Sequence, residues 1–168
     1  MAHEVPRPEP PPGSASAWPR AWIAYDEYRL IHDRYIEVLY REGIVESDNL
    51  VFTEVAEGRK LRQVHLEGEI VCALGVRVRV SKWLDVRQAT DGVEVLSTFY
   101  QYHAWRPRAG RRREQPLIRY DQAHEALHRH RFEPTGASLP PQALSLEAMP
   151  RLDAVVREAV EIAVHWGG

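Results

Sequence analysis

The feature that most restricts the fold is the strict alternation of the run VRVRVSKWLDV at residues 76–86. Val76, Val78 and Val80 share one parity, and Arg77 and Arg79 share the other. A period of two indicates a β-strand with one face on a core and the other toward solvent. Further strands are expected in residues 61–86, 93–105 and 116–121, with a hairpin at Asp91-Gly92. The aromatic and branched runs 21–31 and 34–40 also favour strands, with His32-Asp33 as a turn between them.

The C-terminal segment follows a different period. Leu152, Val156 and Val160 recur at helical spacing with charged residues opposite, which predicts an amphipathic helix from about Leu152 to Val164. Several strands followed by one helix predict an α+β fold, in which a single antiparallel sheet carries this helix packed on one face. Residues 126–142 are expected to be irregular. Six prolines in residues 1–19 predict a disordered arm, which leaves 20–168 as a single domain.

One polar side chain interrupts the apolar face of the alternating strand. Lys82 has the parity of Val80 and Leu84, so a regular strand would point its ammonium toward the core. An unpaired buried ammonium is costly, so it needs a partner or a ligand. The alternatives are a lysine that reaches solvent at the strand end, or a bulge that reverses the parity.

Charge is unevenly distributed along the 168 residues. The formal net charge is −2, yet residues 103–131 hold eight arginines and three acidic residues, a local charge of +5. The same segment holds four of the eight histidines. Imidazoles transfer protons near neutral pH or bind metals, and arginines hold phosphates through bidentate hydrogen bonds. The segment therefore predicts chemistry on a phosphate, namely one of a nucleic acid.

The strongest constellation lies at residues 119–130. It comprises Arg119, Tyr120, Asp121, His124, His128 and His130. Two imidazoles can serve as general base and general acid, while a cation such as Lys82, Arg119 or Arg129 stabilises a phosphorane. His128 and His130 share a face only in an extended chain, whereas His124 and His128 share one only in a helix. The spacing is not HExxH, so the zinc signal is weak, and a solvated loop remains the alternative.

The remaining candidates are less specific. His103 lies on a predicted strand, where a histidine is more often structural, and Cys72 is expected to be a buried thiol. We expect no cofactor, because the chain has no P-loop and no GxGxxG. Without a signal peptide or a long apolar run, a cytoplasmic protein is expected. The arginines predicted to contact a nucleic-acid backbone are Arg106, Arg108, Arg111, Arg112, Arg113 and Arg129.

Residues 25–131 resemble the TumE-type toxins of bacterial and archaeal toxin–antitoxin modules. The resemblance lies in YDEYRL, DRYIEVLY, GVRVRVSKWLDV, TFYQYHAW and LIRYDQAHEALHRHRFEP. It implies a growth-arresting toxin that acts on RNA and pairs with a helix-turn-helix antitoxin. The matching positions are Lys82, Tyr102, His103, Arg119, Tyr120, Asp121, His124, His128 and His130. Gln122 departs from the family's asparagine, and the insertion RAGRRREQ and the proline arm exceed the compact form.

Three hypotheses follow. The first is a metal-independent ribonuclease toxin, in which His124 or His128 is the base and His130 or His103 the acid. In it, Lys82 and Arg119 stabilise the phosphorane and Asp121 orients an imidazole. The second is a non-catalytic module that binds nucleic acid or an antitoxin, and the third is a metal-dependent nuclease. Substrate identity and any homo-oligomer stay open.

Overall fold

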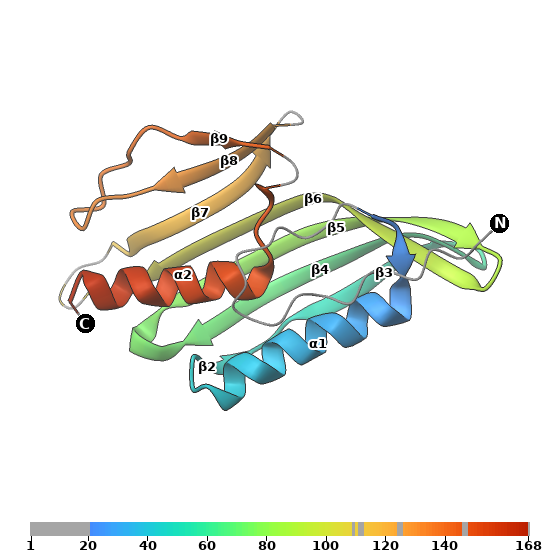
Figure 1. Cartoon of the computed structure of the whole chain (residues 1–168), viewed down its shortest axis with the longest axis horizontal. Coiled ribbons are helices and arrows are strands. Elements are labelled where there is room, and N and C mark those ends of the chain that lie inside the picture. The colour runs from blue at the N-terminus through green and yellow to red at the C-terminus, as the bar shows by residue number, and fades with distance from the viewer. Residues whose placement is uncertain (1–20, 109, 111–112, 124–125, 146–147, 168) are drawn as a thin grey trace.

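A long antiparallel meander dominates the computed structural model, which describes residues 21–108, 110, 113–123, 126–145 and 148–167 (Figure 1). Nine strands form one sheet in the order β2-β4-β5-β6-β7-β8-β9, with β1 paired to β6 and β3 paired to β4. The chain order is β1 (Ile23–Ala24), α1 (Tyr25–Arg41), β2 (Val45–Asp48), β3 (Val51–Glu57), β4 (Lys60–Cys72), a short 3-10 turn (Ala73–Gly75), β5 (Arg77–Ala89), β6 (Gly92–Arg106), β7 (Gln115–Ala123), β8 (Ala126–Arg131), β9 (Gln142–Leu144) and α2 (Leu152–His165). The expected α+β class, with a large antiparallel sheet and a C-terminal helix, is confirmed.

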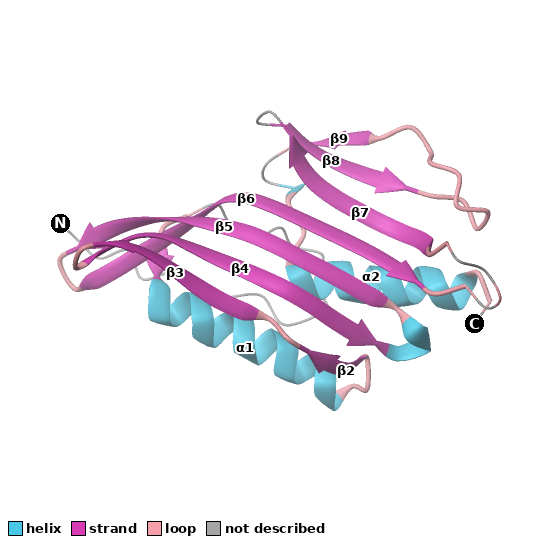
Figure 2. Cartoon of the chain, turned by 180° about the vertical axis from the view of Figure 1, so that it is seen from behind, coloured by secondary structure: helices cyan, strands magenta, loops and turns pink. Residues whose placement is uncertain are grey.

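Both helices lie along the same face of the sheet, as the two opposite views show (Figure 2). The main core cluster joins Leu39 of α1 and Val156 of α2 with Val80, Tyr102 and Leu127 of the sheet. We call this side the helix-covered face and the opposite side the open face. No described helix lies on the open face (Figure 2). None of the described helices is both long and apolar enough to cross a membrane.

The N-terminal segment corrects the sequence analysis. The strands predicted at 21–31 and 34–40 are wrong, because Tyr25–Arg41 is one continuous α-helix with His32 and Asp33 in its middle. Its buried side chains are Tyr25, Tyr28, Ile36 and Leu39, which recur at helical spacing and form a single stripe. Acidic residues in the first turn and Arg41 in the last turn also favour the helix through its dipole.

The segment 126–142, predicted to be irregular, is also corrected in part. It contains β8, which pairs with β7, and it ends at β9, which pairs with β8. Leu127 is fully buried in this strand and supplies its apolar anchor. The Asp91-Gly92 hairpin is confirmed, because Ala89 of β5 pairs with Gly92 of β6. The predicted helix is confirmed as Leu152–His165, and the arm 1–19 lies outside the described residues.

Candidate functional site

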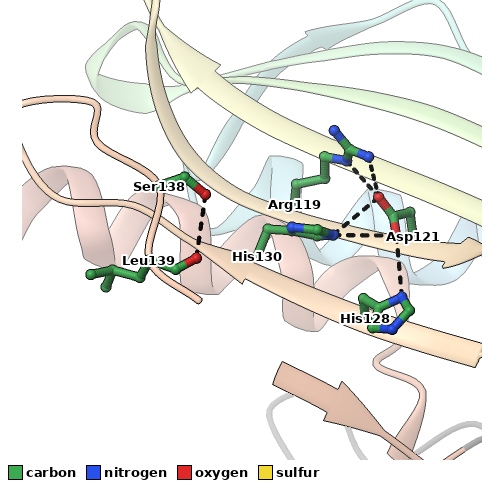
Figure 3. Close-up of polar contacts among 6 residues, drawn as sticks. All are labelled: Arg119, Asp121, His128, His130, Ser138 and Leu139. Atoms are coloured by element: carbon green, nitrogen blue, oxygen red, sulfur yellow. Dashed lines mark hydrogen bonds and ion pairs between the residues drawn. The ribbon is translucent and has the colours of Figure 1, made fainter. Parts of the chain in front are cut away.

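Four polar side chains of the β7–β8 hairpin meet on the open face, and we call them the Asp121 cluster: Arg119, Asp121, His128 and His130. Arg119 Nε donates to Asp121 Oδ2 at 2.6 Å, and Arg119 Nη2 contacts the same oxygen (Figure 3). His130 Nε2 lies 3.3 Å from Asp121 Oδ2 and 3.4 Å from Oδ1. His128 Nδ1 lies 3.9 Å from Oδ1. One carboxylate therefore contacts a guanidinium and two imidazoles.

The hairpin register explains why these residues meet. Asp121 pairs directly with His128 and Arg119 with His130 across β7 and β8. Alternate residues of a strand share a face, so all four side chains emerge on the same side. The extended alternative for His128 and His130 is thus the one observed. Their ring centroids are 6.2 Å apart, close enough for both rings to reach one small group between them.

Solvent exposure differs within the Asp121 cluster. Asp121 is only 6% exposed, so its carboxylate depends on these neighbours for hydrogen bonds. The side chain of Arg119 is 42% exposed and those of His128 and His130 are 31% and 22% exposed. The three surrounding groups can therefore be reached from solvent while the carboxylate fixes their orientation.

His103 lies beside this cluster on β6. It pairs with Arg79 of β5 on one side and with Arg119 of β7 on the other. Its ring centroid is 5.3 Å from that of Trp105. Burial lowers the pKa of His103, and the positive charges of Arg119 and Arg79 lower it further. These effects favour a neutral imidazole that can accept a proton.

Lys82 lies on the helix-covered face, so the sheet separates it from the Asp121 cluster. It is 6% exposed, and its Nζ lies 5.0 Å from the ring centroid of Tyr28 on α1. The parity predicted from sequence holds at Lys82, because the pairing of β5 with β6 is regular up to Trp83 and shifts only after it. The two alternatives, a lysine that reaches solvent and a bulge that reverses the parity, are both wrong. The structure does not bring Lys82 together with the histidines.

Two hollows border the helices rather than the Asp121 cluster. The first holds about 30 Å³ beside Lys82 and is lined by His32, Tyr35, Arg151 and Asp153 among others. The second, of about 370 Å³, runs along α2 between Leu117, Phe132 and Trp166. The Asp121 cluster lines neither of them and lies on the sheet surface.

The two tyrosines of the family resemblance also belong to the helix-covered face. Tyr102 is 1% exposed, and burial raises its pKa well above the usual value. Tyr120 donates from its hydroxyl to Glu158 Oε2 of α2 at 2.6 Å. Burial and this acidic partner raise the pKa of Tyr120. Both phenols therefore connect the sheet to the helix layer.

The predicted nucleic-acid arginines are dispersed. Arg106 donates to Ala163 O and Gly167 O at 3.2 Å each, at the C-terminal end of α2. Arg108 donates to Pro134 O at 2.7 Å, and Arg129 forms an ion pair with Glu158 on the helix-covered face. Arg113 is exposed. Arg111, Arg112 and His124 lie outside the described residues.

Metal ligands and the thiol of Cys72 are the remaining candidates for chemistry among the described residues. Among the described residues, no group of three or more His, Cys, Asp or Glu side chains is arranged to hold a metal ion. In the Asp121 cluster, Arg119 already occupies the carboxylate that a metal would need. Cys72 is fully buried as expected, and burial raises its pKa to about 12.

Several residues of the open face were not predicted from the sequence. The ring of His65 on β4 stacks on that of Trp83 on β5, with 4.0 Å between centroids and 4° between planes. The Arg79 guanidinium lies 5.0 Å above the Trp105 ring. The parity of Arg79, Ser81 and Trp83 places them on one face, but only the register between strands shows which residues lie beside them.

No family model, no curated protein and no solved structure matches this chain. A function can therefore be inferred only from the arrangement of the Asp121 cluster and the surface around it.

Proposed function

We propose that the protein is a ribonuclease toxin that cleaves RNA on the open face by histidine acid–base catalysis, without a metal. The observation that supports this most is the convergence of Arg119, His128 and His130 on the Asp121 carboxylate. Two imidazoles and one guanidinium can supply the base, the acid and the positive charge that phosphodiester transfer uses. The carboxylate orients them, as the third group of a catalytic triad does.

The proposed reaction uses the 2′-hydroxyl of RNA as nucleophile. His128, the imidazole farther from Asp121, removes the proton as the 2′-oxygen attacks phosphorus. The bond from phosphorus to the 5′-oxygen breaks, and His130 donates its proton to that leaving oxygen. Asp121 Oδ2 lies 3.3 Å from His130 Nε2 and orients that ring, and Arg119 stabilises the charge on the phosphorane. The products are a 2′,3′-cyclic phosphate and a 5′-hydroxyl.

The position of the cluster suits a polymer better than a small molecule. Small-molecule sites are usually concave and enclosed, whereas the Asp121 cluster lies on the surface of a sheet. RNA is commonly recognised on open antiparallel sheets that leave room for an extended strand. The family resemblance adds a helix-turn-helix antitoxin as partner, and a cytoplasmic location is part of the same proposal.

A second candidate is a module that binds RNA or an antitoxin without catalysis. The same surface position favours it, because the described hollows lie at the helices and not at the Asp121 cluster. In that case, the ion pair of Arg119 with Asp121 and the two imidazoles only stabilise the β7–β8 hairpin.

The test is single-turnover cleavage of an end-labelled single-stranded RNA in EDTA, over a range of pH. We expect a bell-shaped profile, and His128→Ala and His130→Ala should each slow the bound reaction by about 10²–10⁴-fold. RNA affinity should change much less. His165→Ala is the matched control, because His165 is an exposed histidine at the end of α2. It should cleave like the wild type.

Two results would redirect the assignment. Loss of cleavage in EDTA with recovery in zinc or manganese would make the histidines metal ligands. Retained RNA binding without cleavage at any pH would favour the non-catalytic module.

A further inference from the structure

Three aromatic residues occupy paired positions on neighbouring strands of the open face, and we call them the aromatic row: His65, Trp83 and Phe99. They come from the adjacent strands β4, β5 and β6, and Trp83 is the direct register partner of both others. The His65 and Trp83 rings are parallel at a centroid distance of 4.0 Å. Cross-strand partners point to the same side of a sheet, so the row faces away from the helices.

The His65 ring of the row is held in place by polar contacts. His65 Nε2 is 3.1 Å from Ser81 Oγ, and His65 Nδ1 is 3.5 Å from a carboxylate oxygen of Glu67. With both ring nitrogens engaged, the imidazole is fixed and supports the indole of Trp83 from one side. A fixed aromatic surface loses little entropy when a flat ligand stacks on it.

Phe99, at the other end of the row, is not part of the packed core. Phe99 is 37% exposed although Tyr100 beside it in sequence is 1% exposed. Single exposed apolar residues are common, but this one is the direct register partner of Trp83, whose ring stacks on His65. Every nucleobase has a flat face that stacks on such rings.

The row lies close to the Asp121 cluster. Phe99 precedes Gln101 by two residues on β6, and Gln101 pairs with Asp121. With about 3.4 Å per residue along a strand and about 4.8 Å between strands, the backbones at Phe99 and Asp121 are separated by about 8 Å. A nucleotide next to a phosphate held at the cluster can therefore place its base over Phe99.

The distribution of charge on the open face also favours an RNA strand that runs from the Asp121 cluster to the aromatic row. Arg79 is 66% exposed and Arg119 is 42% exposed, and they flank His103 in the register. The acidic residues Glu67 and Glu69 lie on β4, at the far side of Arg79 and Ser81. A phosphate backbone is thus expected along the β5–β7 side, with bases toward the aromatic row.

We propose that His65, Trp83 and Phe99 form a base-stacking subsite for an unpaired nucleotide next to the scissile phosphate. The substrate is then single-stranded RNA, because the bases of a duplex are already stacked and paired inside the helix. This inference depends on the proposed function for the position of the scissile phosphate. The stacking itself can be measured without cleavage.

The experiment uses a fluorescent 2′-O-methyl single-stranded oligonucleotide, which lacks the attacking hydroxyl and so reports binding alone. Phe99→Ala and Trp83→Ala should each weaken binding by roughly 5-fold to 100-fold, the range expected for loss of one stacked base. Leu30→Ala is the matched control, because Leu30 is a 50% exposed apolar residue on α1. It should bind like the wild type.

The second part of the test uses a set of oligonucleotides, each with a single abasic nucleotide at a different position. At one position, the abasic change should weaken binding as much as Phe99→Ala does, and the two together should add no further loss. Equal binding of Phe99→Ala and wild type, or tighter binding of a duplex of the same sequence, would overturn the subsite.

The outcomes also separate the two proposals. If the wild type cleaves RNA but the aromatic variants bind normally, the subsite fails and the ribonuclease stands. If the aromatic variants lose binding but no protein cleaves RNA, the ribonuclease fails and stacking stands. If Phe99→Ala disrupts self-association but leaves oligonucleotide binding unchanged, the row contacts a second copy of the chain and the subsite is wrong.

Discussion

At the scale of single residues, burial and local charge set the behaviour of the titratable groups on the two faces. His32 of α1 lies close to Lys82 inside the helix layer, with its ring edge-on to Phe52 at 5.2 Å. Burial, followed by the positive charge of Lys82, lowers the pKa of His32 to about 4. Folding therefore favours the neutral imidazole at this position.

This shift predicts how stability depends on pH. The unfolded chain binds a proton at His32 near its ordinary pKa of 6.5, whereas the folded chain resists protonation until about pH 4. The contribution of His32 to the free energy of unfolding is fully present above pH 6.5 and is lost as the pH falls toward 4. Between pH 7 and pH 5, we expect the wild type to lose roughly 2 kcal/mol more unfolding free energy than His32→Gln.

Urea denaturation at both pH values measures this difference. His165→Gln serves as control, because His165 is exposed at the end of α2 and its loss should leave the wild-type pH dependence. Part of the acid sensitivity should remain in His32→Gln, since the pKa of His103 is lowered too. Identical losses in wild type and His32→Gln would contradict the account of His32.

At the scale of elements, Gly68 of β4 leaves room for the connection between β2 and β3 to pack against the strand. Its φ is +145°, and an added Cβ would lie 2.8 Å from both Asn49 O and Asn49 Oδ1 and 2.9 Å from Leu50 Cα. The Asn49 side chain in turn accepts a hydrogen bond from Glu69 N at 2.6 Å. The connection can lie across the strand only where a side chain is missing.

Gly68→Ala should therefore cost more stability than another glycine replacement with similar backbone strain. Gly92 has a φ of +134°, and a Cβ added there would meet no atom within 4 Å, so Gly92→Ala reports the strain alone. We expect Gly68→Ala to lose about 1–3 kcal/mol more, the usual cost of overpacking. Equal melting temperatures of the two variants would show that the connection moves aside freely.

The contact between α1 and α2 depends on a buried ion pair at the start of α2. Arg151 Nε and Nη2 each donate to Asp153 at 3.0 Å, and Arg151 Nη1 donates to the Tyr35 hydroxyl of α1 at 3.0 Å. The side chains of Arg151 and Asp153 are 3% and 1% exposed. Removal of one partner leaves the other charge in the protein interior.

Asp153→Ala is expected to destabilise the fold by roughly 3–5 kcal/mol, as breaking a buried pair commonly does. Glu37→Ala removes one partner of an exposed ion pair, in which the side chains of Arg41 and Glu37 are 68% and 61% exposed. This variant should change stability by less than about 1 kcal/mol. Thermal denaturation of both variants checks the contrast. A small loss in Asp153→Ala would indicate that water replaces the carboxylate.

The elements also show what a sequence can predict. The parity of residues 76–86 and the Asp-Gly hairpin predicted β5 and its turn, because a period of two depends only on neighbours in the chain. The same reasoning failed at α1, where aromatic and branched composition outweighed the helical spacing of Tyr25, Tyr28, Ile36 and Leu39. Strand propensity is weak when packing against a sheet decides the structure.

The candidate site was predictable to the extent that it is local. Asp121, His128 and His130 were found because one hairpin carries them all. Lys82 was associated with them by residue type and by the family resemblance, although its parity already pointed to the core. His65 and Trp83 meet only through the pairing of β4 with β5, since register between strands depends on the whole sheet.

At the scale of the whole molecule, the sheet separates two chemically different faces. The helix-covered face buries Lys82, Tyr102 and Tyr120 among the side chains of α1 and α2. The open face presents the Asp121 cluster and the aromatic row on adjacent strands. The central claim is that the chemistry belongs to the open face and that the helix-covered face only holds the sheet in shape.

The most direct test compares single-turnover RNA cleavage, in EDTA, by His130→Ala and Lys82→Met, with circular dichroism to confirm that both are folded. Methionine approximates the shape of the lysine without its charge. We predict that His130→Ala cleaves about 10²–10⁴-fold more slowly than the wild type, whereas Lys82→Met cleaves at the wild-type rate. A folded Lys82→Met that has lost cleavage, beside an active His130→Ala, would contradict the account and assign the chemistry to the helix-covered face.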